Sequence, residues 1–518
     1  MQTNMKGESR TKKTMLNAKM NLICYFASFI TAFFTRKILL DQLGAEFIGF
    51  TGTVGSLLSF LNLAELGIGT AIGYVLYKPI ADGDRFKINE IISVLGYLYR
   101  KIGYAILSIG IITSFFLPLI FPSTTFSWVV IYFGFYAYLT SSLIGYFANY
   151  KATLLSADQR NYIVTGYFQL TTTSKVILQM VLAIFVQSFI VYFLIELLFG
   201  IINSIILNWK ISKTYPWLMN EVKLGNKLLK KYPEITTYIK QIFAHKVGWV
   251  VHGQLSPILI YSFATLPVVA LYTNYTLLTQ KIENLVSAVI NSAGAAIGNL
   301  IAEGDKEKTL KVFQELFAFR IFITSIVTAC VYNFSSQLIE VWLGEQYVLD
   351  NATVTLIAIL CGLNIARGAI DQFNHAFGLY GDIWAPYIEC IITIASSIVG
   401  GHILGLSGIL LGSLISTITI NYVWKPYYLF SRGFKISVFM HWRTFIIHLV
   451  AAIAAYLVTA YICNQVIRPF VTATGWIELI IEGLLYMITI ITLTFAAFYV
   501  TSKGFRDIVG RTKFKIKN

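Results

Sequence analysis

The chain has few of the residues that build disulfide-bonded domains and soluble enzymes. Its 518 residues include only five cysteines, and none of them stands in a Cys-x-x-Cys pair. The sequence therefore predicts neither a disulfide framework nor a metal site. It contains no Walker A motif, which excludes a P-loop ATPase. No catalytic motif and no cofactor-binding motif is present, so we expect neither an enzyme nor a cofactor.

Charged residues are also scarce, at 13% of the chain, whereas 56% of the residues are hydrophobic. This composition, with a mean hydropathy of +0.69, predicts a protein embedded in a membrane. A net charge of +15 would suit a nucleic-acid partner in a polar protein. In a chain this apolar, basic loops instead indicate membrane orientation and contacts with anionic membrane lipids, so we expect no nucleic-acid partner.

Hydrophobic runs long enough to cross a membrane, which takes roughly 20 residues per helix, recur along the whole chain. They predict an all-α polytopic membrane protein with about fourteen transmembrane helices. The expected spans are 20–40, 46–77, 91–121, 126–149, 161–186, 189–212, 244–265, 269–300, 312–333, 352–378, 383–402, 405–429, 442–463 and 474–500.

The basic residues predict the orientation of these spans. Most Lys and Arg residues lie in the N-terminal segment, in the connections after even-numbered spans and in the C-terminal tail. In this assignment Arg320 and Lys425 belong to the basic connections. The opposite connections are short and carry Arg468 with acids such as Glu340 and Asp350. By the positive-inside rule we expect both termini in the cytoplasm.

A weak internal duplication predicts how the spans are grouped. Gly69-Thr-Ala-Ile-Gly73 resembles Gly294-Ala-Ala-Ile-Gly298, and an Ala-acid-Gly-Asp motif follows each at nearly the same distance. A Gly-x-x-x-Gly pattern alone more often serves helix packing, but the shared register indicates two parallel, pseudo-symmetric six-helix bundles around a central cavity. The predicted segments are a basic cytoplasmic N-terminus (1–19), the first bundle (20–212), a basic cytoplasmic linker (213–243), the second bundle (244–430), two additional helices (431–500) and a basic cytoplasmic tail (501–518).

We single out five of the cationic side chains within the predicted spans: Arg36, Lys37, Lys175, Lys281 and Arg367. Charge inside a membrane is costly and usually faces a water-filled cavity, so all but Lys37 are candidates for binding an anionic substrate. For Arg36 and Lys37 the alternative is snorkelling to the outer interface. For Lys175 the alternative is an ion pair with an acid on another helix. Lys281 shares one helical face with several asparagines.

Several carboxylates also fall inside the predicted spans. Asp371 follows Arg367 by four residues, so a structural ion pair competes with phosphate recognition by the arginine. Asp371, Glu65 and His252 are candidates for coupling transport to an ion gradient, the alternative being hydrogen bonding within the bundle. Glu283 is expected to point away from the face that carries the asparagines.

Three sequence motifs near the N-terminus carry a family resemblance. They are Arg36-Lys-Ile-Leu-Leu-Asp-Gln-Leu-Gly44, Phe60-Leu-Asn-Leu-Ala-Glu-Leu-Gly67 and Leu76-Tyr-Lys-Pro79. Together they resemble the start of bacterial polysaccharide flippases of the O-antigen and capsule type. These proteins belong to the multidrug/oligosaccharidyl-lipid/polysaccharide exporter superfamily. The similarity is strongest over residues 15–110 and implies a MATE-like fold of six, six and two helices.

The resemblance implies that the chain moves an undecaprenyl-diphosphate-linked oligosaccharide repeat unit across the bacterial cytoplasmic (inner) membrane. It further implies alternating access coupled to an ion gradient, with a polysaccharide polymerase and assembly proteins as partners. In related flippases, cations of a central cavity meet the diphosphate, and a lateral gap between the first and eighth spans admits the lipid tail. Arg36 and Lys281 lie on those two predicted spans.

Three other functions are alternatives. A multidrug or cation antiporter of the same superfamily would prefer an acidic, aromatic-lined cavity. A membrane glycosyltransferase or polysaccharide polymerase would need catalytic acids on large extracytoplasmic loops, and the predicted outward loops are short. A scaffold in an envelope-assembly complex would leave the intramembrane cations unexplained.

Overall fold

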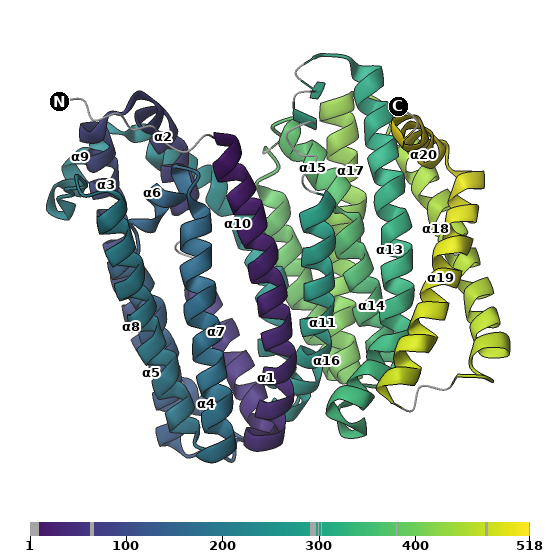
Figure 1. Cartoon of the computed structure of the whole chain (residues 1–518), viewed down its shortest axis with the longest axis horizontal. Helices are drawn as coiled ribbons and strands as arrows, with labels where there is room; N and C mark the ends of the chain where they lie inside the picture. The colour runs from purple at the N-terminus through teal and green to yellow at the C-terminus, as the bar shows by residue number, and fades with distance from the viewer. Residues whose placement is uncertain are drawn as a thin grey trace. The chain divides into compact units, whose positions relative to one another are not determined.

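The computed structural model describes residues 10–62, 67–290, 297–298, 300–301, 303–379, 381–471 and 475–516, and the regular elements in these ranges are helices (Figure 1). In chain order they are α1 (Arg10–Leu61), α2 (Ile68–Asp82), α3 (Arg85–Phe115), α4 (Leu117–Ile120), α5 (Trp128–Ala148), α6 (Ala152–Ala157), α7 (Asn161–Phe185), α8 (Phe189–Thr214), η2 (Val222–Leu224), α9 (Gly225–Lys231), α10 (Pro233–Phe263), α11 (Leu266–Ile290), α13 (Lys306–Leu343), η4 (Glu345–Tyr347), α14 (Asn351–Ala366), α15 (Gly368–Ala376), α16 (Trp384–Thr417), η5 (Ile418–Trp424), α17 (Lys425–Tyr428), η6 (Leu429–Phe434), α18 (Phe439–Ile462), η7 (Cys463–Ile467), α19 (Trp476–Thr501) and α20 (Lys503–Ile516).

Among the described residues, nine helices are long and apolar enough to cross a membrane, so the chain is an all-helical, multi-pass membrane protein. Two of them, Met15–Leu61 and Trp384–Phe434, are long enough for two crossings each. Both change direction at a glycine, Gly44 (φ 85°) and Gly405 (φ 56°). Only glycine adopts such positive φ values at little cost. Gly44 stands between the predicted spans 20–40 and 46–77, and Gly405 is the first residue of the predicted span 405–429.

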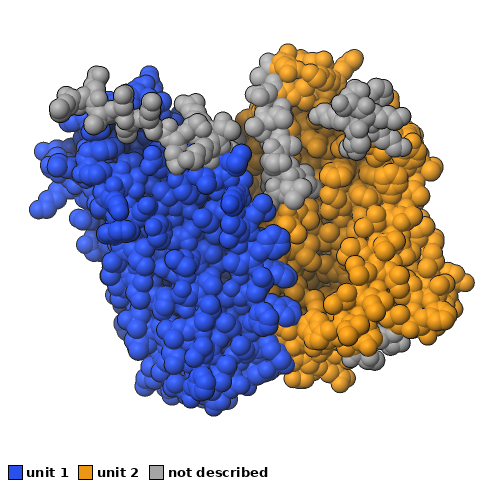
Figure 2. Space-filling model, viewed as in Figure 1, with its two compact units in different colours: residues 1–270 blue, residues 271–518 orange. Residues whose placement is uncertain are grey.

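The helices form two compact units, residues 1–270 and 271–518, which Figure 2 shows in different colours. In the first unit α1 packs along α7, α5 packs along α8, and α10 packs against both α1 and α2. In the second unit α13 packs against α14 and α19, and α18 packs along α19. The boundary between the units lies after α10, whereas the predicted second bundle begins at residue 244, within α10. The assignment of α10 to the second bundle therefore stays a prediction.

The acid-Gly-Asp residues of the duplicated motif make the same turn in both units. Asp84 caps α3 by accepting a hydrogen bond from the Lys87 amide at 2.9 Å, and Asp305 caps α13 in the same way. The glycines before these aspartates, Gly83 and Gly304, have φ angles of 70° and 79°. The motif thus ends one helix and begins the next in each unit. Most of the second Gly-x-x-x-Gly copy lies outside the described residues.

We expect Asp84→Ala and Asp305→Ala each to lower the free energy of unfolding by about 1 kcal/mol, because each removes the acceptor for an unpaired helix amide. Thermal unfolding of the purified chain in detergent measures the effect. The matched controls are Asp84→Asn and Asp305→Asn, since asparagine caps helices as well as aspartate does. Equal losses for the alanine and asparagine variants would contradict a capping role.

The linker packs against α3. Gly225, at the start of α9, lies so close to α3 that an added Cβ would stand 2.3 Å from the Tyr97 Cβ atom. Lys231 and Tyr232 both donate hydrogen bonds to Glu90, at 2.7 and 2.5 Å. Burial raises the pKa of Glu90, but these two hydrogen bonds outweigh it and hold the pKa below its usual value. The linker is therefore tied to the first unit by packing as well as charge.

An aromatic core fixes α15 within the second unit. Phe373 of α15 is fully buried and packs edge-on against Phe313 of α13, with ring centroids 5.1 Å apart. It also contacts Phe434, which continues the cluster. Close-packed aromatic side chains hold their helices in place. The polar residues that α15 carries beside Phe373 are thereby held in a defined position.

Candidate functional site

The second unit contains a cavity of about 540 Å³ beside a break in a helix. Helix α14 ends at Ala366 and α15 begins at Gly368, so Arg367 occupies the junction between them. We call this space the basic cavity. It is lined by Ser287, Gly298, Arg320, Asn364, Arg367, Gly368, Asp371, Gln372, His375 and Ala376.

One carboxylate in the basic cavity is shared by several cations. Asp371 lies 3.1 Å from Lys425 Nζ and 3.7 Å from Arg367 Nε. It also interacts electrostatically with Arg320 and His375. The predicted pair of Arg367 and Asp371 is therefore present. Because two further cations surround the same carboxylate, the pair does not neutralise its surroundings.

Arg320 is the most deeply buried cation of this group, with 1% of its surface exposed. Its Nη1 atom donates a hydrogen bond to the Ile365 carbonyl at 3.1 Å, near the end of α14. The guanidinium lies directly against Gly368, where an added Cβ would stand 2.1 Å from Nη1. The glycine after the helix break thus makes room for the arginine.

A second carboxylate lies next to this cluster. The Asn364 side-chain amide donates to Glu283 Oε1 at 3.5 Å, and Glu283 interacts electrostatically with Arg367. Glu283 of α11 thus reaches α14, a contact that its position in the sequence did not predict. The side chains around the basic cavity thus include three cations, Arg320, Arg367 and Lys425. The two carboxylates beside them are Asp371 and Glu283.

Lys175 lies in the first unit. It both lines a cavity and forms an ion pair with an acid on another helix, which were the two alternatives for this residue. Its Nζ atom is 2.7 Å from Glu196 Oε1 on α8, so it forms the ion pair with another helix. Gln179 donates to the second oxygen of Glu196 at 3.3 Å. Both members of the ion pair line a cavity of about 400 Å³, which we call the Lys175 cavity.

The other predicted cations occupy different surroundings. Arg36 is half-buried on α1 and interacts with Tyr192 of α8. Lys37 pairs with Asp41 at 3.4 Å, with both side chains 44% exposed. Lys281 lies on α11 and is not among the described residues that line the basic cavity.

For two of the three candidates for ion coupling, the structure does not describe the side chain. Glu65 lies outside the described residues, and His252 lies on α10 at a position whose side chain is not described. Asp371 is the third and sits at the centre of the basic cavity. Among the residues described, no group of three or more His, Cys, Asp or Glu side chains is arranged to hold a metal ion.

Sequence reasoning missed Arg320 and Lys425 as site residues. Both were assigned to basic connections, yet Arg320 is buried within α13 and Lys425 pairs with Asp371 from α17. One signal was available for both residues, because Arg320 falls within the predicted span 312–333 and Lys425 falls within 405–429. Lys425 lies in an irregular stretch, between the π-helical segments η5 and η6. A hydropathy profile does not predict π-helical segments, although such segments often accompany functional sites.

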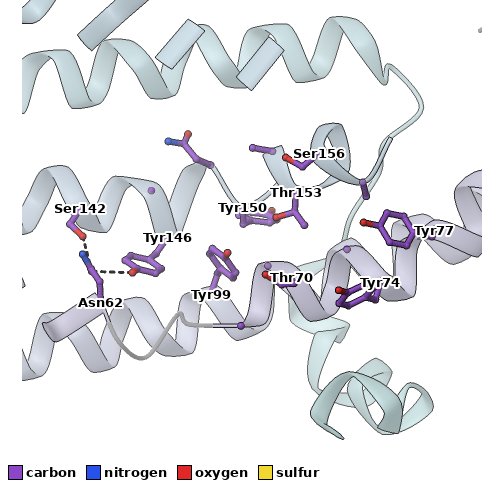
Figure 3. Close-up of a pocket in the computed structure, with 17 residues that line it drawn as sticks. Asn62, Thr70, Tyr74, Tyr77, Tyr99, Ser142, Tyr146, Tyr150, Thr153 and Ser156 are labelled. Carbon is purple, nitrogen blue, oxygen red and sulfur yellow. Dashed lines mark hydrogen bonds between the residues drawn. The ribbon is translucent and has the colours of Figure 1, made fainter. Parts of the chain in front are cut away.

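The first unit also holds a larger cavity, of about 730 Å³. It shares Asn62, Ser142, Gly145 and Asn149 with the Lys175 cavity, so the two cavities adjoin each other. We call it the tyrosine cavity after the side chains that Figure 3 shows around it. These are Tyr74, Tyr77, Tyr99, Tyr146 and Tyr150.

The fold defines a class, a multi-pass helical membrane protein, and it is similar to the folds of several solved transporters. The solved structure of lipid II flippase MurJ, in an inward closed conformation, matches with a TM-score of 0.65 at 14% identity. That match covers 94% of this chain and 99% of MurJ.

Two transporters of the MATE family also match, each at 14% identity. An inward-facing multidrug resistance transporter of the MOP superfamily has a TM-score of 0.58, covering 82% of this chain and 95% of its own. The Vibrio cholerae transporter VcmN, solved as a point mutant, has a TM-score of 0.50, covering 82% of this chain and 99% of VcmN. At this identity the matches establish the fold, and these structural neighbours are transporters. No protein-family model and no curated protein sequence matches the chain.

Proposed function

We propose that the chain is a flippase that moves an undecaprenyl-diphosphate-linked oligosaccharide repeat unit across the cytoplasmic membrane for surface polysaccharide synthesis. The observation that carries this proposal is the basic cavity. There Arg320, Arg367 and Lys425 converge on the single carboxylate of Asp371 inside an apolar helical protein. An excess of cations at membrane depth is costly unless a bound anion neutralises it.

The chemistry of such a substrate requires this kind of cavity. A diphosphate and its sugars cannot cross hydrocarbon unaided, because their charges and hydroxyl groups would lose their hydrogen bonds to water. Guanidinium groups replace those bonds with two parallel donors to each phosphate. The polyprenyl tail is apolar and remains in the lipid throughout. The protein therefore has to shelter only the head group.

In this mechanism Asp371 keeps the cavity ready in the absence of substrate. It holds Arg367 and Lys425 in place, and the incoming diphosphate competes for both of them. The ion pair is partly open, since the Asp371 and Arg367 side chains are 28% and 21% exposed. Exchange of one anion for another costs less than exposing unpaired cations. Asp371 is thereby also a candidate for coupling transport to ions, together with Glu65 and His252.

We further infer about fourteen crossings with both termini cytoplasmic, in the predicted arrangement of six, six and two helices. Alternating access would occur between the bundles 20–212 and 244–430, which the linker 213–243 connects. Arg36, Lys175 and Lys281 would provide further contacts for the diphosphate along its path. A polysaccharide polymerase and assembly proteins would receive the product.

A multidrug or cation antiporter is the second candidate, and the carboxylates Glu283 and Asp371 near the basic cavity favour it. A lipophilic cation would bind these acids once they were released from Arg367 and Lys425. Uptake of a quaternary ammonium dye into vesicles that contain the purified chain tests this function. Proton-driven dye uptake that undecaprenyl diphosphate does not inhibit would favour the antiporter over the flippase.

We expect the chain to restore surface polysaccharide in bacterial cells that lack their own polysaccharide flippase, and Arg367→Ala to abolish this restoration. Loss of a charge-assisted contact of about 1.5 to 3 kcal/mol would lower substrate affinity by roughly 10- to 150-fold. Lys281→Ala and a Lys175→Met/Glu196→Gln double variant are expected to reduce it less. Polymer on the cell surface is measured by gel and lectin staining, with expression checked by blot.

The matched control is Arg443→Ala, which removes an exposed arginine from α18 of the same unit. This variant should behave like the wild type. The strain used is the one from which the chain comes, with its own gene deleted, so that the sugar composition of the substrate is correct. Full polymer synthesis in the deletion strain would contradict the proposal. So would full activity of a well-expressed Arg367→Ala variant.

A further inference from the structure

The tyrosine cavity differs in chemistry from the basic cavity. It is the larger space, at about 730 Å³, and no charged side chain is among the described residues that line it. Its walls combine tyrosine rings with amide and hydroxyl side chains from α2, α3, α5 and α6 and from Asn62, which follows α1 (Figure 3). Sequence reasoning did not identify it, because tyrosine, asparagine and serine do not stand out in a hydropathy profile.

Hydrogen bonds hold the polar walls of this cavity in place. The Asn62 side-chain oxygen accepts hydrogen bonds from Ser142 Oγ at 2.9 Å and from the Tyr146 hydroxyl at 3.0 Å. Elsewhere in the wall the Tyr150 hydroxyl accepts a hydrogen bond from Asn220 at 2.7 Å. The rings of Tyr99 and Tyr146 lie 5.8 Å apart. Rings fixed in this way present apolar faces and hydroxyl groups to a ligand. Their side chains lose little conformational entropy when the ligand binds.

This combination suits one class of ligand, an uncharged carbohydrate. A sugar ring has an apolar face of C–H groups and a rim of hydroxyl groups that both donate and accept hydrogen bonds. Tyrosine rings pack against such a face, while tyrosine, serine and asparagine side chains match the rim. A cationic ligand would call for carboxylates and a phosphate would call for arginine or lysine. Neither type of side chain lines the described walls of this cavity.

We propose that the tyrosine cavity is a binding subsite for the saccharide portion of the substrate, separate from the cations that contact the diphosphate. This inference rests on the proposed flippase function and extends it. Basic residues of the predicted cytoplasmic connections directly follow several of the tyrosines in sequence: Lys78 after Tyr77, Arg100 after Tyr99, and Lys151 after Tyr150. The sugar would thus be bound at the cytoplasmic end of the first unit, on the side of the membrane where the substrate is made.

Two glycines allow this cavity to be filled without disturbing the packing around it. Gly73 on α2 and Gly145 on α5 both line the cavity, and an added Cβ at either position meets nothing within 4 Å. Leucine at these positions would occupy the space for a sugar ring and would also favour the helix. Gly483 on α19, in the other unit, is equally open and provides the control.

The test measures binding by the full-length chain in lipid nanodiscs. The two probes are undecaprenyl diphosphate and the undecaprenyl-diphosphate-linked oligosaccharides extracted from the source cells. We expect the wild type to bind the glycosylated lipid at least about tenfold more tightly than the bare lipid. Gly145→Leu and Gly73→Leu should reduce this ratio to within about twofold while the affinity for the bare lipid is kept. Gly483→Leu should leave the ratio unchanged.

The outcomes separate the two proposals. A ratio near one in the wild type, or a full ratio in both leucine variants, would overturn the saccharide subsite and leave the flippase intact. Failure of the wild type to bind either lipid would overturn the proposed function and the subsite with it. Using leucine variants on two different helices guards against misfolding of one, and size-exclusion chromatography confirms that each variant is intact.

Discussion

Arg320→Gln is expected to abolish export of surface polysaccharide while leaving the chain folded. Arg320 is almost completely buried beside Asp371 and Arg367, so its charge acts over a short distance through apolar surroundings. Glutamine retains a donor for the Ile365 carbonyl but carries no charge. Loss of about 1.5 to 3 kcal/mol of charge-assisted binding would reduce the affinity for undecaprenyl diphosphate by roughly 10- to 150-fold.

Binding of undecaprenyl diphosphate to the purified variant measures this loss directly, and surface polymer in the deletion strain measures its consequence. Arg320→Lys provides a graded comparison, since it keeps the charge but not the planar pair of donors. Arg443→Gln, on the exposed side of α18, should change neither quantity. If Arg320→Gln bound the lipid as tightly as the wild type does, Arg320 would be a structural residue and the basic cavity would have to be reassigned.

The second large effect is expected from Gly368→Ala. A methyl group at this position would stand 2.1 Å from Arg320 Nη1, so the guanidinium must move away from the helix break. Helix α15 would gain up to about 1 kcal/mol in propensity, against about 1 to 3 kcal/mol for overpacking. The net loss in the free energy of unfolding is therefore roughly 0 to 3 kcal/mol. Lipid binding by the folded variant should fall about as far as it does in Arg320→Gln.

A double-mutant cycle shows whether the glycine acts through the arginine. Adding Gly368→Ala to Arg320→Gln should cause much less additional loss of binding than it causes in the wild type, because the displaced group is already altered. Gly483→Ala, at an open position on α19, should have no effect on binding. Independent, additive losses would mean that Gly368 contributes by some route other than the position of Arg320.

The sequence predicted an all-helical, multi-pass membrane protein because hydropathy acts locally. The bends at Gly44 and Gly405 coincide with predicted boundaries between spans, since glycine marks a change of helix direction in the sequence itself. The repeated Ala-acid-Gly-Asp motif likewise forms the same cap in both units. Such features depend on a few neighbouring residues, so a linear pattern is enough to find them.

The candidate site was predicted only in part, because its residues come from several helices. Arg367 and Asp371 are neighbours on one helical face, and their pairing follows from spacing. The contact between Glu283 and Asn364 was not predicted, since it depends on how α11 packs against α14. Lys425 was assigned to a connection, although the chain around it winds irregularly and brings its ammonium to Asp371.

By itself the sequence determined that this is a multi-pass helical protein, because a bilayer demands about 20 apolar residues per crossing. It also showed that cations stand within apolar stretches. Only the tertiary structure decided which of them converge. Arg320 joins Arg367 because Gly368 lets α13 and α15 approach closely, and the tyrosines form a cavity because separate helices present them to one space. Packing between helices, which no local pattern encodes, sets both arrangements.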